Sequence, residues 1–411
     1  MRILHTSDWH LGQHFMGKSR QAEHQALIDW LLAQVEAHAV DAVLIAGDVF
    51  DTGAPPSYAR ELYSQLVVRL HGAGVALLLL GGNHDSVSTL GESRALLACL
   101  SATVVAAVDA AADQLVVLPL RGGQGEAGCV VCAVPFIRPR DVLQSQAGQS
   151  AEEKQQSMQA AIQAYYQAVH TAGRARQAEL QNTLGRTVPL IATGHLTTVG
   201  ASSNESVREI YVGSLDAFPT AAFPAMDYIA LGHIHKPQKV GGLEHIRYCG
   251  SPIPLGFDEA RQQKEMLLVD LGAHGLTAVT PLLVPRFQPL VSVSGNLAAL
   301  ADAIRAAAQE GSAEQPVWLE VTVAEDDYLA DLPTRIDALT QGLPVEVLRV
   351  RRQRGNAAAS MSGAAGETLD ELSPDDVFAR RLAQEELAPE LHLALGQRYR
   401  AVVTSLTEGQ A

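Results

Sequence analysis

The stretch Val75-Ala-Leu-Leu-Leu-Leu-Gly-Gly-Asn-His-Asp85 indicates the fold of this chain. It begins with six apolar, uncharged residues. A short apolar run that ends in glycine is typical of a buried strand in an α/β sheet. Open α/β sheets bind their ligands at the carboxyl ends of the strands, which is where Gly82 to Asp85 lies. Asn83 offers a neutral oxygen, His84 can bind a metal or carry a proton, and the glycines let the backbone approach an ion closely.

Four other predicted strands end in residues of the same chemical kind, and each motif after the first has a glycine before its ligand. A single His after a strand is more often structural, and Gly-Asn-His-Asp alone is compatible with an ordinary turn. Five such turns in one order on one scaffold are very improbable without a shared role. The five motifs are Asp8-Trp9-His10, Gly47-Asp48-Val49-Phe50-Asp51, Gly82-Asn83-His84-Asp85, Gly194-His195 and Gly232-His233-Ile234-His235.

Together these motifs predict a site for two metal ions. Two adjacent divalent ions need about six to eight protein donors, with one carboxylate shared between them. Mixed imidazole and carboxylate donors suit Mn, Fe or Zn better than Ca or Mg. Mn is the expected metal, with Mg, Fe and Zn as alternatives. The predicted ligands are Asp8, His10, Asp48, Asn83, His195, His233 and His235.

The composition is that of a globular protein with a substantial core. The 411 residues carry a formal net charge of −15, which argues against a free-standing DNA clamp. A nuclease remains possible, because bound divalent ions and a basic partner can supply positive charge. No apolar run is long enough for a membrane span, and the first strand begins at once, so a cytoplasmic, nucleoid-associated location is expected. Cys129 and Cys132 are expected to be small core residues, since positions i and i+3 of a strand face opposite ways.

The apolar pattern predicts strands that alternate with helices in the first part of the chain, with a long inserted helix at about 151–181. A second unit has the β-α-β-α-β order and is expected to be of ferredoxin-like type. A Gly-, Ala- and Ser-rich linker follows it. Ser373 and Pro374 then predict the start of a terminal helix pair. The predicted division is 1–280, 281–354, 355–369 and 370–411.

The five motifs resemble those of the calcineurin-like metallophosphoesterases over about residues 1–280. The resemblance implies a β-sandwich flanked by helices, with two metals that share Asp48. In that family, a residue in the place of His84 contacts the scissile phosphate or protonates the leaving oxygen, and Asp51 is similar to the carboxylate that orients this histidine. Asp85 is left with a turn-forming role. The implied ligand sets are Asp8, His10, Asp48 and His235 for one metal, and Asp48, Asn83, His195 and His233 for the other.

Beyond the first unit, the whole chain resembles the nuclease subunits of the double-strand-break repair family. The matching stretches are His5–Gly12, Gly47–Asp51, Pro55–Tyr58, Gly232–Pro237 and Tyr248–Pro252. The resemblance implies that 281–354 caps the active site and contacts DNA, and that the terminal helices grip the root of a coiled-coil ATPase partner. It implies a Mn-dependent double-strand exonuclease and single-strand or hairpin endonuclease, which acts in DNA repair, recombination and replication.

DNA-binding residues and a dimer face are also predicted. The basic cluster of Arg349, Arg351, Arg352 and Arg354, and the loop residues Lys18 and Arg20, are candidates for phosphate contacts. The apolar stripe of the helix at 57–71 either forms a homodimer face, as in this family, or belongs to the core.

Two other functions fit parts of the pattern. One is a metallophosphatase or cyclic-nucleotide phosphodiesterase that acts on small substrates, and the predicted terminal helix pair argues against it. The other is a scaffold without catalysis, and the complete set of predicted ligands argues against that.

Overall fold

The computed structural model describes residues 1–122, 125–143, 150–202, 217–324 and 331–352, together with 395, 398 and 399. The predicted linker at 355–369, the predicted terminal helices at 370–411 and Arg354 therefore lie outside the described residues, apart from those three positions. Within the described ranges, no helix combines the length and apolar character that crossing a bilayer requires.

The first sheet has six strands in the order β14-β13-β1-β4-β5-β6. The four strands β1, β4, β5 and β6 are parallel, and β13 and β14 continue the sheet in antiparallel fashion. The sequence did not predict β14, which extends the sheet past residue 280. The strands are β1 (Arg2–Thr6), β4 (Ala42–Ile45), β5 (Ala76–Leu80), β6 (Ala102–Val105), β13 (Glu265–Gly272) and β14 (Gly275–Leu283).

The second sheet also has six strands, in the order β11-β12-β10-β9-β8-β7. Strands β8, β9, β10 and β12 are parallel, and the two outermost strands are antiparallel to their neighbours. These strands are β7 (Leu115–Pro119), β8 (Ala127–Cys132), β9 (Leu190–His195), β10 (Tyr228–Gly232), β11 (Gln238–Lys239) and β12 (Ile246–Tyr248).

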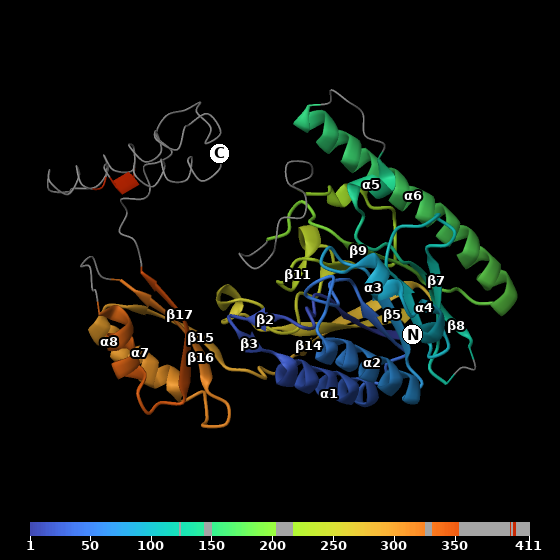
Figure 1. Cartoon of the computed structure of the whole chain (residues 1–411). Coiled ribbons are helices and arrows are strands. Elements are labelled where there is room, and N and C mark those ends of the chain that lie inside the picture. Colours follow the sequence, from blue (N-terminus) through green and yellow to red (C-terminus); the bar gives the residue numbers. More distant parts are fainter. Residues whose placement is uncertain are drawn as a thin grey trace.

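The two sheets pack face to face and are covered by helices on their outer sides (Figure 1). Leu44 of the first sheet and Ile191 of the second belong to the buried cluster between them. Helices α1 (Gln21–Ala37) and α2 (Ser57–Gly72) bury their apolar faces on the first sheet, and α6 (Ala151–Leu184) does so on the second. This is the α/β architecture that the sequence predicts, and α6 matches the predicted long helix.

A smaller prediction concerns two cysteines of this sandwich. Cys129 and Cys132 are both buried free thiols, one in the cluster between the sheets and the other under α6, as alternation along β8 requires.

The short elements of the sandwich are β2 (His14–Phe15), β3 (Lys18–Ser19), α3 (Val87–Gly91), α4 (Arg94–Ala98), α5 (Pro139–Val142), η1 (Thr220–Ala222), η2 (Val240–Gly242) and η3 (Phe257–Glu259).

The described residues between 290 and 352 form a second unit, called here the small domain, with its own apolar core. It has the predicted β-α-β-α-β order, but its three strands are all parallel and follow chain order. The ferredoxin-like prediction is therefore wrong, because that topology inserts an extra strand into a split β-α-β unit. The elements are β15 (Leu290–Gly295), α7 (Leu297–Ala308), β16 (Val317–Val323), α8 (Leu332–Thr340) and β17 (Val345–Arg352).

The small domain lies beside the sandwich (Figure 1), and aromatic side chains form the contact between the two. Phe15 of β2 stacks on Trp318 of β16, with ring centroids 5.6 Å apart and planes at 10°. Phe257 of η3 packs against the other side of this group, 5.2 Å from Phe15. Lys18 of β3 adds an ion pair of 2.7 Å with Glu346 of β17.

Candidate metal centre

The five motifs converge because each follows the carboxyl end of a parallel strand. Strands β1, β4 and β5 are neighbours in the first sheet, and β9 and β10 are neighbours in the second. The close approach of the two sheet ends depends on small residues. A Cβ on Gly82 would lie 2.1 Å from Oδ1 of Asp48, and a Cβ on Gly232 would lie 2.0 Å from the carbonyl oxygen of Ala46. Glycine at these positions lets the ligand-bearing turns pack together.

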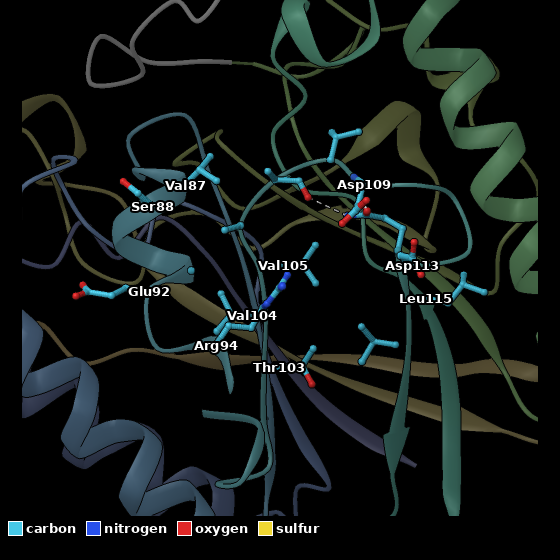
Figure 2. Close-up of a pocket in the computed structure, with 16 residues that line it drawn as sticks. Val87, Ser88, Glu92, Arg94, Thr103, Val104, Val105, Asp109, Asp113 and Leu115 are labelled. Atoms are coloured by element: carbon cyan, nitrogen blue, oxygen red, sulfur yellow. Dashed lines mark hydrogen bonds between the residues drawn. The ribbon is translucent and has the colours of Figure 1, made fainter. Parts of the chain in front are cut away.

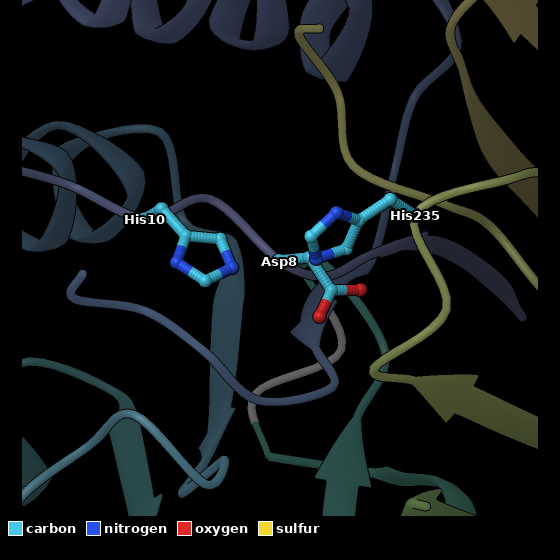
Figure 3. A group of neighbouring side chains, drawn as sticks. All are labelled: Asp8, His10 and His235. Carbon is cyan, nitrogen blue, oxygen red and sulfur yellow. The ribbon is translucent and has the colours of Figure 1, made fainter. Parts of the chain in front are cut away.

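Among the described residues there are three groups of side chains that could hold a metal ion. Within each group, the potential ligand atoms all lie within 4.8 Å of one another. The first is Asp8, His10 and His235, whose side chains point toward one another in Figure 3. The second is His10, Asp48 and His84, and the third is Asp48, His195 and His233. Asp48 is common to the second and third groups. The structure thus brings together all the charged and imidazole ligands that the sequence predicts.

Four of these residues have a positive backbone angle φ, which residues with a Cβ rarely adopt. The values are 54° for Asp8, 47° for His10, 49° for Asp48 and 91° for His233. Such conformations cost about 1–3 kcal/mol each and persist where the surrounding structure holds them. Their concentration at one point marks the motifs as a functional site rather than ordinary turns.

Asp48 lies at the centre of the site. Its Oδ2 is 3.6 Å from Nε2 of His10 and 3.3 Å from Nε2 of His195, and its Oδ1 accepts a hydrogen bond of 2.9 Å from the N–H of His84. One carboxylate therefore faces an imidazole from each sheet, His10 after β1 and His195 at the end of β9, which is the arrangement of a bridging ligand.

Asn83 completes the half that holds His195. Its Oδ1 is 2.9 Å from Nε2 of His195 and 3.2 Å from Nδ1 of His233. On the other side, the carboxylate of Asp8 is fixed by the N–H of His233 at 2.9 Å and the hydroxyl of Ser7 at 2.5 Å. Asn83 is partly exposed, so this half of the site is open to solvent.

The ring orientation of three histidines is set by an oxygen behind each. Nδ1 of His10 faces Oδ1 of Asp51 at 3.2 Å, and Nδ1 of His235 faces Oε1 of Glu259 at 3.0 Å. Nδ1 of His195 faces the carbonyl of Ala46 at 2.8 Å. An oxygen at Nδ1 requires the proton there and directs Nε2 toward the site, as in carboxylate–histidine–metal arrangements.

The donors fit a pair of divalent cations. Nε2 of His10 is buried and has no hydrogen-bond partner among the described residues. Nε2 of His195 faces two acceptor oxygens, from Asp48 and Asn83, so its lone pair needs either a proton or a cation between them. Burial lowers the pKa of His195, but the Asp48 carboxylate outweighs it and raises this pKa to about 9. A metal at this position therefore displaces a proton.

His84 lies at the rim of the centre. It is partly exposed, its ring packs edge-on against His10 at 4.7 Å, and its Nδ1 is 2.8 Å from the carbonyl oxygen of Asp51. The sequence predicted that the Asp51 carboxylate would orient His84. In the structure the main-chain carbonyl of Asp51 makes this contact, while the carboxylate faces His10, because the turn after Asp48 presents carbonyl and side chain in different directions.

Asp85 is a structural residue, as the sequence suggested. Its buried carboxylate accepts hydrogen bonds from the N–H groups of Val49 (3.1 Å), Phe50 (2.9 Å) and Gly82 (2.9 Å). It thereby ties the turn that carries Asp48 to the turn that carries Asn83. Burial and the nearby Asp48 raise its pKa to about 6.

Sequence reasoning missed Glu259. This fully buried carboxylate contacts His235 and forms an ion pair of 2.6 Å with the buried Lys264. Burial favours the neutral acid, but the hydrogen bond from His235 and the charge of Lys264 outweigh it and keep the pKa of Glu259 below its usual value. Glu259 follows no strand end and has no ligand-type spacing, so the sequence carried no signal for it.

The predicted DNA-contact residues differ in their availability. Arg20 is buried and bonded to Glu23, Gln13 and the carbonyl of Pro254, so its prediction as a DNA contact is wrong. Its side chain turns inward, where the guanidinium is satisfied. Lys18 is paired with Glu346, and both Arg349 and Arg351 lie within 4 Å of Glu320.

The stripe of the helix at 57–71 belongs to the core. Leu62, Leu66 and Leu70 are buried against the first sheet, and Tyr58 packs on the same cluster. This stripe cannot also serve as an exposed dimer face.

A separate concavity of about 500 Å³ lies between β6 and β7 (Figure 2). Its charged lining residues are Glu92, Arg94, Asp109 and Asp113. None of the predicted ligands lines it, so this concavity is distinct from the metal centre.

Fold and site together define a metal-dependent phosphoesterase, and comparison with known proteins agrees. Residues 1–237 match the model of the calcineurin-like phosphoesterases, and residues 286–386 match that of the type 5 capsule protein repressor C-terminal domain.

Three relatives, each named as the D subunit of the nuclease SbcCD, are similar over most of the chain. The protein from Escherichia coli K12 is 52% identical over 94% of each chain. That of Rhodobacter capsulatus is 33% identical over 92% of this chain and 94% of its own, and that of Bacillus subtilis is 28% identical over 71% of each. The chain therefore belongs to the calcineurin-like phosphoesterase family, in the branch formed by the D subunits of SbcCD nucleases. The resemblance inferred from the motifs is confirmed.

Proposed function

We propose that this chain is a two-metal DNA phosphodiesterase that degrades duplexes from their ends and cuts single strands or hairpins internally. The observation that carries the proposal is the position of Asp48 between His10 and His195, which is the geometry of a carboxylate shared by two ions. Membership of the SbcCD nuclease branch supports DNA as the substrate.

Two sets of side chains would hold the ions. Mn is the metal that we propose, since the imidazole and carboxylate donors suit Mn, Fe or Zn. Two bound ions supply Lewis-acid stabilisation of the phosphate and lower the pKa of a bound water. One set is Asp8, His10, Asp48 and His235, and the other is Asp48, Asn83, His195 and His233.

His84 is proposed to act on the leaving group. Its Nδ1 contacts the Asp51 carbonyl, an acceptor, so Nδ1 carries a proton and Nε2 is directed away from Asp51. The imidazolium form can then protonate the leaving oxygen or bind a phosphate oxygen from Nε2. Its main-chain N–H donates to Asp48 and holds the backbone of His84 beside the ligands.

The small domain is proposed to bind DNA next to the metal centre. Arg349, Arg351 and Lys18 are each more than a third exposed. Lys18 has a surface ion pair with Glu346, which contributes little and which a phosphate can replace, whereas both arginines lie beside the buried carboxylate of Glu320. Arg352 is exposed and remains a proposed phosphate contact, but it follows Arg351 directly on β17 and therefore faces the other side of the sheet.

The remaining proposals concern partners. Residues 370–411 would bind the coiled-coil root of an SbcC-type ATPase, and the name of the relatives, a subunit of SbcCD, supports such a partner. A homodimer is proposed as well, through surfaces other than the buried stripe of α2. The complex would act on DNA in the cytoplasm, at the nucleoid.

The deciding experiment is cleavage of an end-labelled duplex and of a hairpin with Mn, with and without the ATPase partner. We expect loss of the label from the duplex and internal cuts in the hairpin. Hydrolysis of a chromogenic diester or a cyclic nucleotide without cleavage of any DNA would instead favour the small-substrate enzyme.

A further inference from the structure

The short turn around η3 has two opposite faces. Phe257 and Ala260 are buried in the aromatic cluster between the sandwich and the small domain. Glu259 lies between them in sequence and points the other way, into the metal centre. Positions 257, 259 and 260 of one tight turn thus contact both the small domain and a predicted metal ligand.

On the inner face, Glu259 holds His235 together with Lys264. Oε1 of Glu259 is 3.0 Å from Nδ1 of His235, and Oε2 accepts a hydrogen bond of 2.6 Å from Nζ of Lys264. Lys264 also donates to the main-chain carbonyl of His235 at 2.9 Å. The ring and the backbone of His235 are therefore both fixed by one buried ion pair.

The carboxylate is itself fixed by further donors. Oε2 accepts a hydrogen bond from the hydroxyl of Ser251 at 3.1 Å and from the N–H of Leu255 at 3.0 Å. With these contacts Glu259 has little freedom to move without the turn that carries it.

On the outer face, the turn is covered by the small domain. Phe257 packs on Phe15, which stacks on Trp318, and Leu290 completes the buried group. Phe15 and Phe257 border a hollow of about 430 Å³ on one side, so a displacement passes between them through the ring contacts themselves. A shift of the small domain would therefore move Phe257, and with it Glu259.

We infer that the Phe257–Ala260 turn couples docking of the small domain to the metal centre, with Glu259 as the positioning residue for His235. The inference rests on the proposed two-metal function. Residues behind a metal-binding histidine typically change metal affinity about 10–100-fold when altered. Undocking of the small domain would weaken one of the two metal sites, the one that includes His235, and leave the other unchanged.

The first test separates positioning from folding. Glu259→Gln leaves Lys264 buried without its charge partner, so the double variant Glu259→Gln/Lys264→Met, which removes both charges, is the informative one. Mn binding is measured on the full chain by isothermal titration and by Mn electron paramagnetic resonance, and folding by thermal unfolding in EDTA. We expect the double variant to unfold near the wild-type temperature and to bind one Mn with normal affinity and the other at least about 10-fold more weakly. Two wild-type Mn sites in the double variant would overturn the inference.

The second test acts from the small domain. Trp318→Ala removes the ring that covers Phe15, and Leu339→Ala is the control, because Leu339 packs on the small domain's own core and is not one of the residues of the aromatic cluster. We expect Trp318→Ala to weaken the same Mn site and Leu339→Ala to leave both sites unchanged. Unchanged Mn binding in Trp318→Ala, or equal weakening in both variants, would refute the coupling.

These outcomes are distinct from a failure of the proposed function. If the wild-type chain binds fewer than two Mn ions, the two-metal proposal fails. If the wild type binds two and the variants bind as it does, only the coupling fails.

Discussion

The main-chain N–H of His84 donates a hydrogen bond of 2.9 Å to Oδ1 of Asp48. The proposed general acid is thus attached to the central carboxylate through its backbone, and its ring remains partly exposed. Because the contact does not involve the imidazole, the ring and the metal ligands can be altered separately.

Replacing His84 should therefore abolish cleavage without loss of metal. In His84→Ala the N–H to Asp48 is kept, so both Mn ions should remain bound, while turnover of DNA falls about 10²–10⁴-fold, as for loss of a general acid. Metal content by mass spectrometry and cleavage of a labelled duplex measure the two effects. His10→Ala is the comparison, since it should lose metal together with activity. A parallel loss of metal in His84→Ala would show that His84 is a ligand.

Asp85 should be required for stability and for the shape of the site. Asp85→Ala removes the acceptor of three buried N–H groups, each of which costs about 1–3 kcal/mol when left unpaired. We expect the free energy of unfolding to fall by about 3 kcal/mol or more, and Mn affinity to fall with it. Urea unfolding in EDTA checks the first effect. A loss below about 1 kcal/mol would mean that water or backbone groups replace the carboxylate.

The pH dependence of stability should depend on His24. Burial and the charge of Arg20 lower its pKa to about 3, and its Nε2–H donates to the carbonyl of Trp9 at 3.1 Å. In the unfolded chain the His24 imidazole binds a proton near pH 6.5, whereas in the native protein it does not. Its stabilisation is therefore complete above pH 6.5 and is lost as pH falls toward 3, by about 2 kcal/mol between pH 7 and pH 5.

The variant His24→Gln can still donate to Trp9 but does not titrate. Urea unfolding in EDTA at pH 8, 7 and 5 should show a loss of stability on acidification that is about 2 kcal/mol smaller than in the wild type. At pH 8 the side chain at position 24 is neutral in both proteins. The difference between their free energies of unfolding at this pH is therefore the reference for the lower pH values. Parallel pH profiles for the two proteins would contradict the prediction.

Residues 370–411 should be needed for the partner and not for the chemistry. A chain that ends at 369 is expected to lose binding to an SbcC-type ATPase, since the predicted apolar-striped helices are removed, and to hydrolyse a chromogenic diester at the normal rate. Pull-down with the ATPase and a diester assay measure both. Partner affinity equal to that of the full chain would exclude the docking role of this segment.

The local sequence was sufficient for the ligands because they obey a short-range rule. Each follows an apolar strand within a few residues, and neighbouring parallel strands end at one edge, so Asp8, Asp48 and Asn83 of the first sheet had to meet once the strands were recognised. The packing of the two sheets then decided that His195, which follows a strand of the second sheet, faces them. The same reasoning predicted the long helix at 151–181, whose apolar residues repeat with helical spacing. The predicted β-α-β-α-β order of the small domain itself favours parallel strands, so the ferredoxin-like prediction overlooked a signal that the pattern contained.

What surrounds the ligands was decided only by the tertiary structure. Glu259 reaches His235 across 24 residues and the Asp51 carboxylate reaches His10 across 41, and no spacing rule connects either pair. The inward turn of Arg20 depends likewise on the carbonyl of Pro254, 234 residues away. By itself the sequence determined which residues can bind metal, because that depends on chemical type and on local strand ends. The tertiary structure decided how their rings are oriented and which charges are satisfied, because those contacts depend on segments that only packing brings together.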